Sequence, residues 1–216
     1  MKSDEDVRND VESELRWDPS LDATDIVVTV NHGAVTLAGF VKSFTEKWEA
    51  EDVAKRVAGV FGVANDLDVR LPSISQRPDP EIARDAVTVL HYESPDLGDV
   101  KVVVKDGILR LEGIVASYHQ RRDVARAVRR VRGIKGLVNT IMVRSPVAPD
   151  EIHQSIAEAL KRSALLDAAG IIVKAKGNEV VLEGRVRSWA ERTEAEEAAW
   201  RAPGVLKVDN RITIAS

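Results

Sequence analysis

The sequence predicts an α+β protein made of three tandem αββαβ modules, each a small three-stranded mixed sheet covered by two helices. The main observation is a motif that recurs as VNHGAVTLAGFVKSF at 30–44, VKDGILRLEGIVASY at 104–118 and AKGNEVVLEGRVRSW at 175–189. Successive copies are offset by 74 and 71 residues. This spacing exceeds the period of the common solenoid repeats, so each copy is interpreted as a small domain.

Proline-rich segments separate the copies. Five of the eight prolines fall in two short stretches, Pro72, Pro78 and Pro80, then Pro146 and Pro149. Proline stiffens a linker, and these linkers divide the chain into modules at residues 1–71, 79–144 and 149–216. A module of this size buries only a modest core, so we expect the modules to pack on one another.

Each module is expected to begin with a helix, because apolar residues recur every four positions and form one apolar face. These residues are Val7, Val11 and Leu15 in the first module, Ile82, Ala86 and Leu90 in the second, and Ile152, Ile156 and Leu160 in the third. In the second module, Asp79 is predicted to be the N-cap, with Pro80 at the first helical position.

A β-hairpin is predicted next. In the middle module, Val102 and Val104 alternate with outward residues, and Asp106-Gly107 is predicted to form the tight turn because glycine tolerates positive φ. The corresponding turns are His32-Gly33 in the first module and Gly177-Asn178 in the third. The aligned glycines at 39, 113 and 184 are expected to permit a bulge or the close approach of a helix.

A second helix and a last strand are predicted to complete each module. The helix begins at three capping boxes, Ser43-x-x-Glu46, Ser117-x-x-Gln120 and Ser188-x-x-Glu191, and ends near Gly59, Gly133 and Gly204. Three aligned asparagines follow, namely Asn65, Asn139 and Asn210. Each is expected to bond the backbone of a turn before the last strand.

These repeated patterns resemble the BON (bacterial OsmY and nodulation) domain family. The residues that carry the resemblance are GAVTLAGFVKS with GVFGVANDLDV, GILRLEGIVAS with GIKGLVNTIMV, and NEVVLEGRVRS with GVLKVDNRITI. The resemblance covers nearly the whole chain. It implies a small mixed sheet under two helices, a non-enzymatic role, and a link to envelope stress, osmotic shock and proposed binding of phospholipid or other envelope partners.

The sequence departs from many relatives in one respect that bears on its location. Many relatives carry an export signal, whereas residues 1–12 have no apolar core and do not form one. We therefore expect a cytoplasmic protein, or a periplasmic one if a signal has been trimmed from the chain.

The sequence contains no recognisable catalytic chemistry. It has no cysteine, which excludes disulfides and thiolate chemistry, and no phosphate loop, nucleophile elbow, paired-histidine zinc helix or dinucleotide fingerprint. His119 and Asp123 lie four apart on a helix but lack a third ligand. We therefore predict no enzyme activity, no cofactor and no metal. An isoelectric point near 5.7 also disfavours nucleic acid as a partner.

Charge differs strongly between the modules. Residues 1–72 hold eight basic and fifteen acidic residues, a net charge of −7, whereas residues 73–148 hold thirteen and nine, a net charge of +4. The excess is concentrated in the second helix of the middle module. There, Val124, Ala127, Val128 and Val131 form a predicted buried stripe, and the opposite face carries Arg122, Arg126, Arg129 and Arg130.

These arginines are candidate contacts for anionic lipid or for an acidic protein partner, such as the first module of a neighbouring chain. A solvated helix face explains them equally well. Trp48 and Trp200 are predicted to point away from their own sheets, which makes them candidate interface anchors. Packing of the modules on one another would instead bury both tryptophans within the chain.

Two functions from different classes fit these observations. The first is a binding or scaffold protein of the bacterial stress-response type, which acts through contacts with a protein partner or through self-association, since linked weak sites gain avidity. The second is peripheral binding to an anionic phospholipid surface through the basic helix of the middle module.

Overall fold

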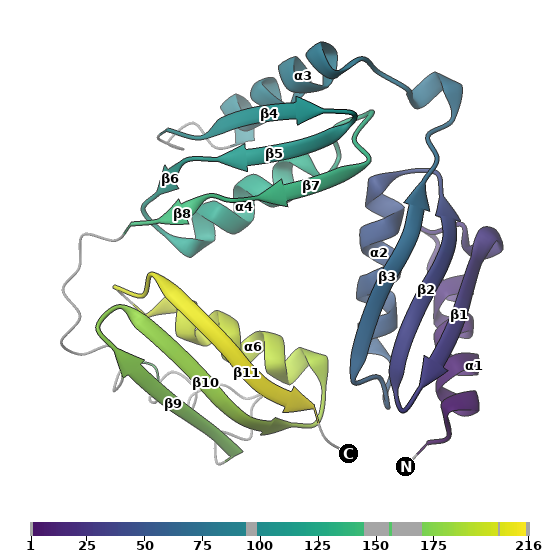
Figure 1. Cartoon of the computed structure of the whole chain (residues 1–216), viewed down its shortest axis with the longest axis vertical. Helices are drawn as coiled ribbons and strands as arrows, with labels where there is room; N and C mark the ends of the chain where they lie inside the picture. The colour runs from purple at the N-terminus through teal and green to yellow at the C-terminus, as the bar shows by residue number, and fades with distance from the viewer. Residues whose placement is uncertain (1, 94–98, 145–155, 157–169, 203, 215–216) are drawn as a thin grey trace. The chain divides into compact units, whose positions relative to one another are not determined.

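The computed structural model describes residues 2–93, 99–144, 156, 170–202 and 204–214 (Figure 1). It is an α+β structure built from small three-stranded mixed sheets, as predicted. The chain forms two compact units. One holds residues up to 115 together with 119–142, and the other holds residues 116–118 together with the chain from 143 onward.

The first module has the predicted order of elements. These are α1 (Asp4–Trp17), β1 (Ile26–Asn31), β2 (Ala34–Val41), α2 (Phe44–Arg56) and β3 (Gly62–Val69), with short 3-10 turns at Ala23–Asp25 and Ser73–Ser75. In the sheet, β2 is the central strand. It pairs antiparallel with β1, where Val28 faces Leu37, and parallel with β3, where Leu37 faces Asn65.

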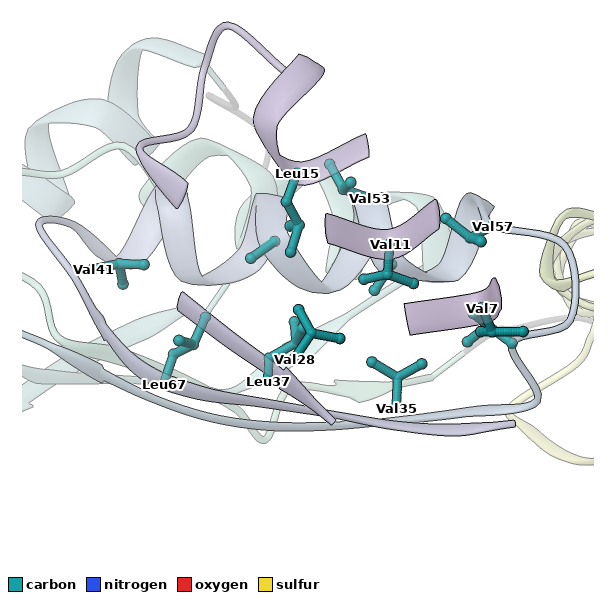
Figure 2. Packing of buried hydrophobic residues seen from close by; sticks show 13 residues of the cluster. Val7, Val11, Leu15, Val28, Val35, Leu37, Val41, Val53, Val57 and Leu67 are labelled. Carbon is teal, nitrogen blue, oxygen red and sulfur yellow. The ribbon is translucent and has the colours of Figure 1, made fainter. Parts of the chain in front are cut away.

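Both helices cover one face of this sheet (Figure 2). The predicted apolar face of α1 is confirmed, since its three residues are at most 2 % exposed. From α2, Ala50, Val53 and Ala54 are fully buried. Figure 2 shows the α1 residues and Val53 packed against side chains that rise from the sheet, among them Val28, Leu37 and Leu67. The core therefore lies between the two helices and one sheet face, and the other sheet face is left uncovered by helices.

The predicted tight turns of the first and middle modules occur, and an aspartate fixes each of them. His32 and Gly33 both have positive φ, at 50° and 72°, as a two-residue hairpin of the primed type requires. The Asp4 carboxylate accepts hydrogen bonds from both of their amides, at 2.7 and 2.9 Å. These two bonds lower the pKa of Asp4, with the Gly33 amide as the larger cause.

Asp79 does the same in the middle module, which corrects one prediction. The helix α3 (Asp79–Glu93) begins at Asp79, so Asp79 is not the N-cap before it. Its carboxylate instead accepts hydrogen bonds from the amides of Asp106 and Gly107, at 2.8 and 3.0 Å. The amides of the turn point at the start of α3, so the Asp79 carboxylate bonds to them and does not cap its own helix.

The middle module repeats the scaffold with interrupted strands. After α3 come β4 (Lys101–Lys105), β5 (Ile108–Glu112), β6 (Ile114–Val115), α4 (Tyr118–Val128), β7 (Gly136–Asn139) and β8 (Met142–Val143). The sheets have the orders β4-β5-β7 and β6-β8. The predicted stripe of α4 is buried as expected, but the helix ends at Val128. Arg129 and Arg130 therefore lie in the turn beyond it, not on the helix as predicted.

The third module shows β9 (Ile171–Lys176), β10 (Glu179–Val186), α6 (Trp189–Arg201) and β11 (Lys207–Ile214), again with the hairpin strand β10 in the centre. Its predicted first helix, with Ile152 and Leu160, lies outside the described residues. Ile156 is described, and it is fully buried in the core of this module.

The repeated glycines make a close backbone approach, though to a carbonyl and not to a helix. Gly39, Gly113 and Gly184 have φ of +110°, +130° and +133°. A Cβ on each would lie 2.0 Å from the carbonyl oxygen of Asp25, Asp99 and Gly170 respectively. The carbonyl that precedes the first strand occupies this space, so a side chain cannot fit.

The repeated asparagines join the last strand to the second helix. Asn65 lies inside β3 and not in a turn before it. Its Nδ2 donates to the Lys47 carbonyl of α2 at 2.8 Å, and its Oδ1 accepts from the Leu67 amide. Asn139 and Asn210 make the same pair of bonds. Each asparagine thus ties a carbonyl of the second helix to the sheet.

Candidate functional site

The candidate site lies on the surface, at the outer faces of the second helices. Among residues 2–93, 99–144, 156, 170–202 and 204–214, no charged side chain is buried, and no group of three metal-ligating side chains converges. Of the helices in that part of the chain, none has the length and hydropathy needed to cross a bilayer.

Two of the predicted site residues, Trp48 and Arg129, contact each other. Both belong to the first compact unit. The Arg129 guanidinium carbon lies 4.2 Å from the centroid of the Trp48 ring, which is cation–π geometry. The Thr45 hydroxyl, one position into α2, donates a hydrogen bond to the Arg129 carbonyl at 3.2 Å. Trp48 is therefore covered by the middle module of its own chain.

Acidic side chains of α2 surround the same contact. Burial lowers the pKa of Arg129, and the negative charges of Asp52 and Glu49 oppose that shift. Burial also raises the pKa of Glu49, reinforced by Asp52. Trp48, Glu49 and Asp52 are all half-buried. We call these three residues with Thr45 the acidic notch of α2.

The other predicted arginines do not share one environment. Arg126 is exposed and pairs with Asp123 at 3.0 Å. Arg130 is exposed in the turn after α4, and Arg122 is half-buried. The four arginines therefore do not form a single free stripe, and the two that project into solvent are Arg126 and Arg130.

Trp200 lies in the interior and not on an open face. It is 8 % exposed and belongs to the core of the third module. Its ring stacks on Tyr118 at 4.3 Å and an interplanar angle of 5°, and both residues belong to the second compact unit. Trp200 is thus a packing residue of that unit, which corrects its predicted outward position.

The structure shows a further surface that sequence reasoning missed, the open sheet face of the middle module. Three apolar side chains are exposed there, Val103 at 47 %, Ile108 at 40 % and Val138 at 39 %. Arg110 pairs with Val103 on one side and Val138 on the other. Strand alternation places Lys101 and Lys105 on the same face as Val103. The same alternation could have predicted the patch from the sequence, because Val103 is an apolar residue at an outward position between Lys101 and Lys105.

The corresponding face of the third module is different. It is crossed by ion pairs, Lys174 with Glu183, Lys207 with Glu179 and Arg211 with Asp209. Such exposed pairs contribute little stability. Ile172 is also exposed on that face, at 57 %.

Comparison with known proteins identifies the repeated unit. A family model described as "BON domain" matches residues 3–70, 78–145 and 150–216. "Osmotically-inducible protein Y" of Escherichia coli (strain K12) is 32% identical over 132 residues. That alignment covers 58% of this chain and 65% of the relative, so it spans less than two thirds of the relative's length.

Solved structures give weaker likenesses. CdsD, a structural protein of the type III secretion system of Chlamydia trachomatis, matches with a TM-score of 0.27 and 18% identity, over 97% of this chain and 92% of that one. The periplasmic domain of PrgH from S. typhimurium matches with a TM-score of 0.24 and 13% identity, over 88% and 93%. These scores are too low to bear on the fold or the function.

Proposed function

This chain belongs to the BON domain family, and from that premise we propose that it is a non-enzymatic binding and scaffold protein of the bacterial stress-response type. It acts through protein–protein contacts of its tandem modules. Three linked copies strengthen weak contacts through effective concentration, without any single tight site.

The observation that carries the proposal is how the repeated residues are used. The glycines at 39, 113 and 184 admit a backbone carbonyl, the asparagines at 65, 139 and 210 tie a helix to a strand, and the serines at 43 and 188 cap a helix. Each repeated residue therefore serves the scaffold. The surfaces differ from copy to copy, which suits modules that meet different partners.

The relative's name supports the link to osmotic stress. The E. coli protein is called osmotically inducible, and we propose the same kind of induction here. The test is quantitative: the abundance of this chain is measured in its host before and after a rise in external osmolarity. A constant abundance would contradict the proposed stress role.

Partner binding is tested by cross-linking in osmotically stressed cells. We expect the wild-type chain to capture a defined protein, or a second copy, and the double variant Arg126→Glu with Arg130→Glu to lose part of it. Arg8→Glu, on the exposed side of α1, is the control for a charge change elsewhere. Recovery of nothing beyond the single chain would contradict the scaffold proposal.

A second candidate function is peripheral binding to anionic phospholipid, and one observation favours it. The open sheet face of the middle module carries exposed Val103 and Ile108 among Lys101, Lys105 and Arg110. A basic residue near an anionic surface contributes about 1 kcal/mol, and partly exposed apolar side chains add to it.

Liposome flotation separates this candidate from the first. Lipid binding requires vesicles with anionic lipid, weakens as salt is raised, and weakens further in Lys101→Glu with Lys105→Glu. Wild-type protein that stays in solution with every vesicle composition would eliminate the lipid function. The protein-contact proposal would remain, because it requires no membrane.

A further inference from the structure

We propose that the acidic notch of α2 is the docking surface for the middle module of the same chain, with Arg129 as its anchor, so that the first two modules move as one body. The inference goes beyond the proposed function. It assigns the opposite charges of the two modules to a joint inside the chain, and it removes Trp48 and Arg129 from the surface available to other partners.

The contact has three independent components at one point. The guanidinium lies over the Trp48 ring, the backbone carbonyl of Arg129 accepts from Thr45, and Glu49 and Asp52 supply negative charge around the cation. The guanidinium can serve the ring and the two carboxylates at once, because it is planar and permanently charged. A chance approach of two surface side chains would not be expected to satisfy the backbone as well.

The ends of the two helices are also complementary. Thr45 lies in the first turn of α2, where the helix carries partial positive charge, and Arg129 directly follows the last residue of α4, Val128. The carbonyl that Thr45 binds belongs to the partially negative end of α4. The two helix ends that meet are therefore of opposite sign, in addition to the side-chain charges.

The position of Arg129 on the chain explains why it docks while Arg126 and Arg130 do not. Arg126 is one helical turn earlier and pairs with Asp123 on its own helix. Arg130, the next residue along the chain, is exposed. The end of α4 at Val128 turns the chain, so Arg129 projects toward the first module while its neighbour does not.

The chain is well suited to a direct test because it contains no cysteine. Spin labels on Arg8→Cys in α1 and Arg84→Cys in α3, both exposed, report the distance between the first two modules. In the otherwise unchanged full chain we expect one narrow distance distribution. Arg129→Ala should broaden it, and the neighbouring Arg130→Ala, the matched control, should leave it narrow.

Amide hydrogen exchange gives a second readout. In Arg129→Ala, the amides of the first turns of α2 should exchange roughly tenfold faster, which corresponds to about 1.4 kcal/mol. The amides of β2 and β5 should be unchanged, which shows that both modules remain folded. Trp48→Leu alone should broaden the distance distribution as much as Arg129→Ala does. The double variant should be little broader than either single variant.

The proposal is overturned if the labelled parent already shows a broad distribution, since the modules would then move independently. It is also overturned if Arg129→Ala keeps the narrow distribution, or if Arg130→Ala broadens it equally. If Arg129→Ala fails to fold, the Trp48→Leu variant decides by the same two readouts.

Discussion

The first and middle modules share one scaffold but carry opposite outer surfaces. At the position of Trp48 the middle module has Arg122, at Asp52 it has Arg126, and at Lys55 it has Arg129. Residues 1–72 hold eight basic and fifteen acidic residues, a net charge of −7. Residues 73–148 hold thirteen basic and nine acidic residues, a net charge of +4. Buried and backbone-fixing positions cannot diverge without loss of the fold, whereas outward positions can, and two unlike copies then become complementary.

The strands differ as well. In the first module β2 and β3 run without a break for eight residues each. In the middle module Gly113 separates β5 from β6, and Thr140 with Ile141 separates β7 from β8. Both the Thr140 amide and its hydroxyl donate to the Leu111 carbonyl, at 2.8 Å each. The same pairing is thus kept with a local distortion. Paired variants at equivalent glycines and asparagines test how far the two modules are equivalent, and two carboxylate variants test features of the first module.

The largest effect is expected from Gly39→Ala. Its Cβ would lie 2.0 Å from the Asp25 carbonyl oxygen at a φ of +110°, so the unfolding free energy should fall by about 3 kcal/mol or more. Gly113→Ala should cost as much if the two scaffolds are equivalent. Gly62→Ala is the control, because no atom lies within 4 Å of its Cβ. Urea unfolding measures the stability of all three variants. A loss in Gly39→Ala as small as that in Gly62→Ala would contradict the steric explanation.

A smaller loss is expected from Asn65→Ala, about 1–2 kcal/mol, because a helix carbonyl and a strand amide both lose a partner. Asn139→Ala should cost somewhat less, since Asn65 also donates to the Glu51 carboxylate at 3.3 Å. Asn9→Ala on the exposed face of α1 controls for the loss of an amide. Equal stability of Asn65→Ala and wild type in urea would show that the tie is dispensable.

The contribution of Asp4 to the stability of the folded protein should depend on pH. Its pKa in the folded protein is lowered by the two turn amides, so the stability that it contributes is present above its ordinary pKa and is lost as pH falls through the lowered value. Asp4→Asn should therefore be less stable than wild type near neutral pH, and the difference should shrink in acid below about pH 4. Urea midpoints across pH measure this, with Glu5→Gln as the control. A difference independent of pH would contradict the assignment.

The smallest change in stability is expected from Glu49→Gln, and this variant should stabilise the chain where the others destabilise it. Burial and Asp52 raise its pKa in the folded protein, so its contribution to stability is greatest in acid and falls as pH rises through the raised value. Glu49→Gln should slightly stabilise the chain near neutral pH and flatten this part of the pH dependence. Glu12→Gln on α1 is the control. A clear loss of stability would instead show that its attraction to Arg129 outweighs burial.

The sequence by itself determined the scaffold. The alternation of the hairpins, the four-residue spacing of Val7, Val11 and Leu15, and the capping serines at 43 and 188 depend on neighbours within one or two turns. Each was predicted correctly for that reason. Even so, local reasoning placed the bonds of Asp79 and Asn65 wrongly, since their partners lie on elements that are distant along the chain.

Only the tertiary structure decided which outward residues remain outward. Trp48 and Arg129 look equally exposed on a helical projection, yet each covers the other, and Trp200 is buried in its own unit. Val103, Ile108 and Val138 emerged as an exposed patch only when three strands were placed side by side. The physical reason is that exposure depends on what packs against a face, and periodicity within one element carries no information about that neighbour.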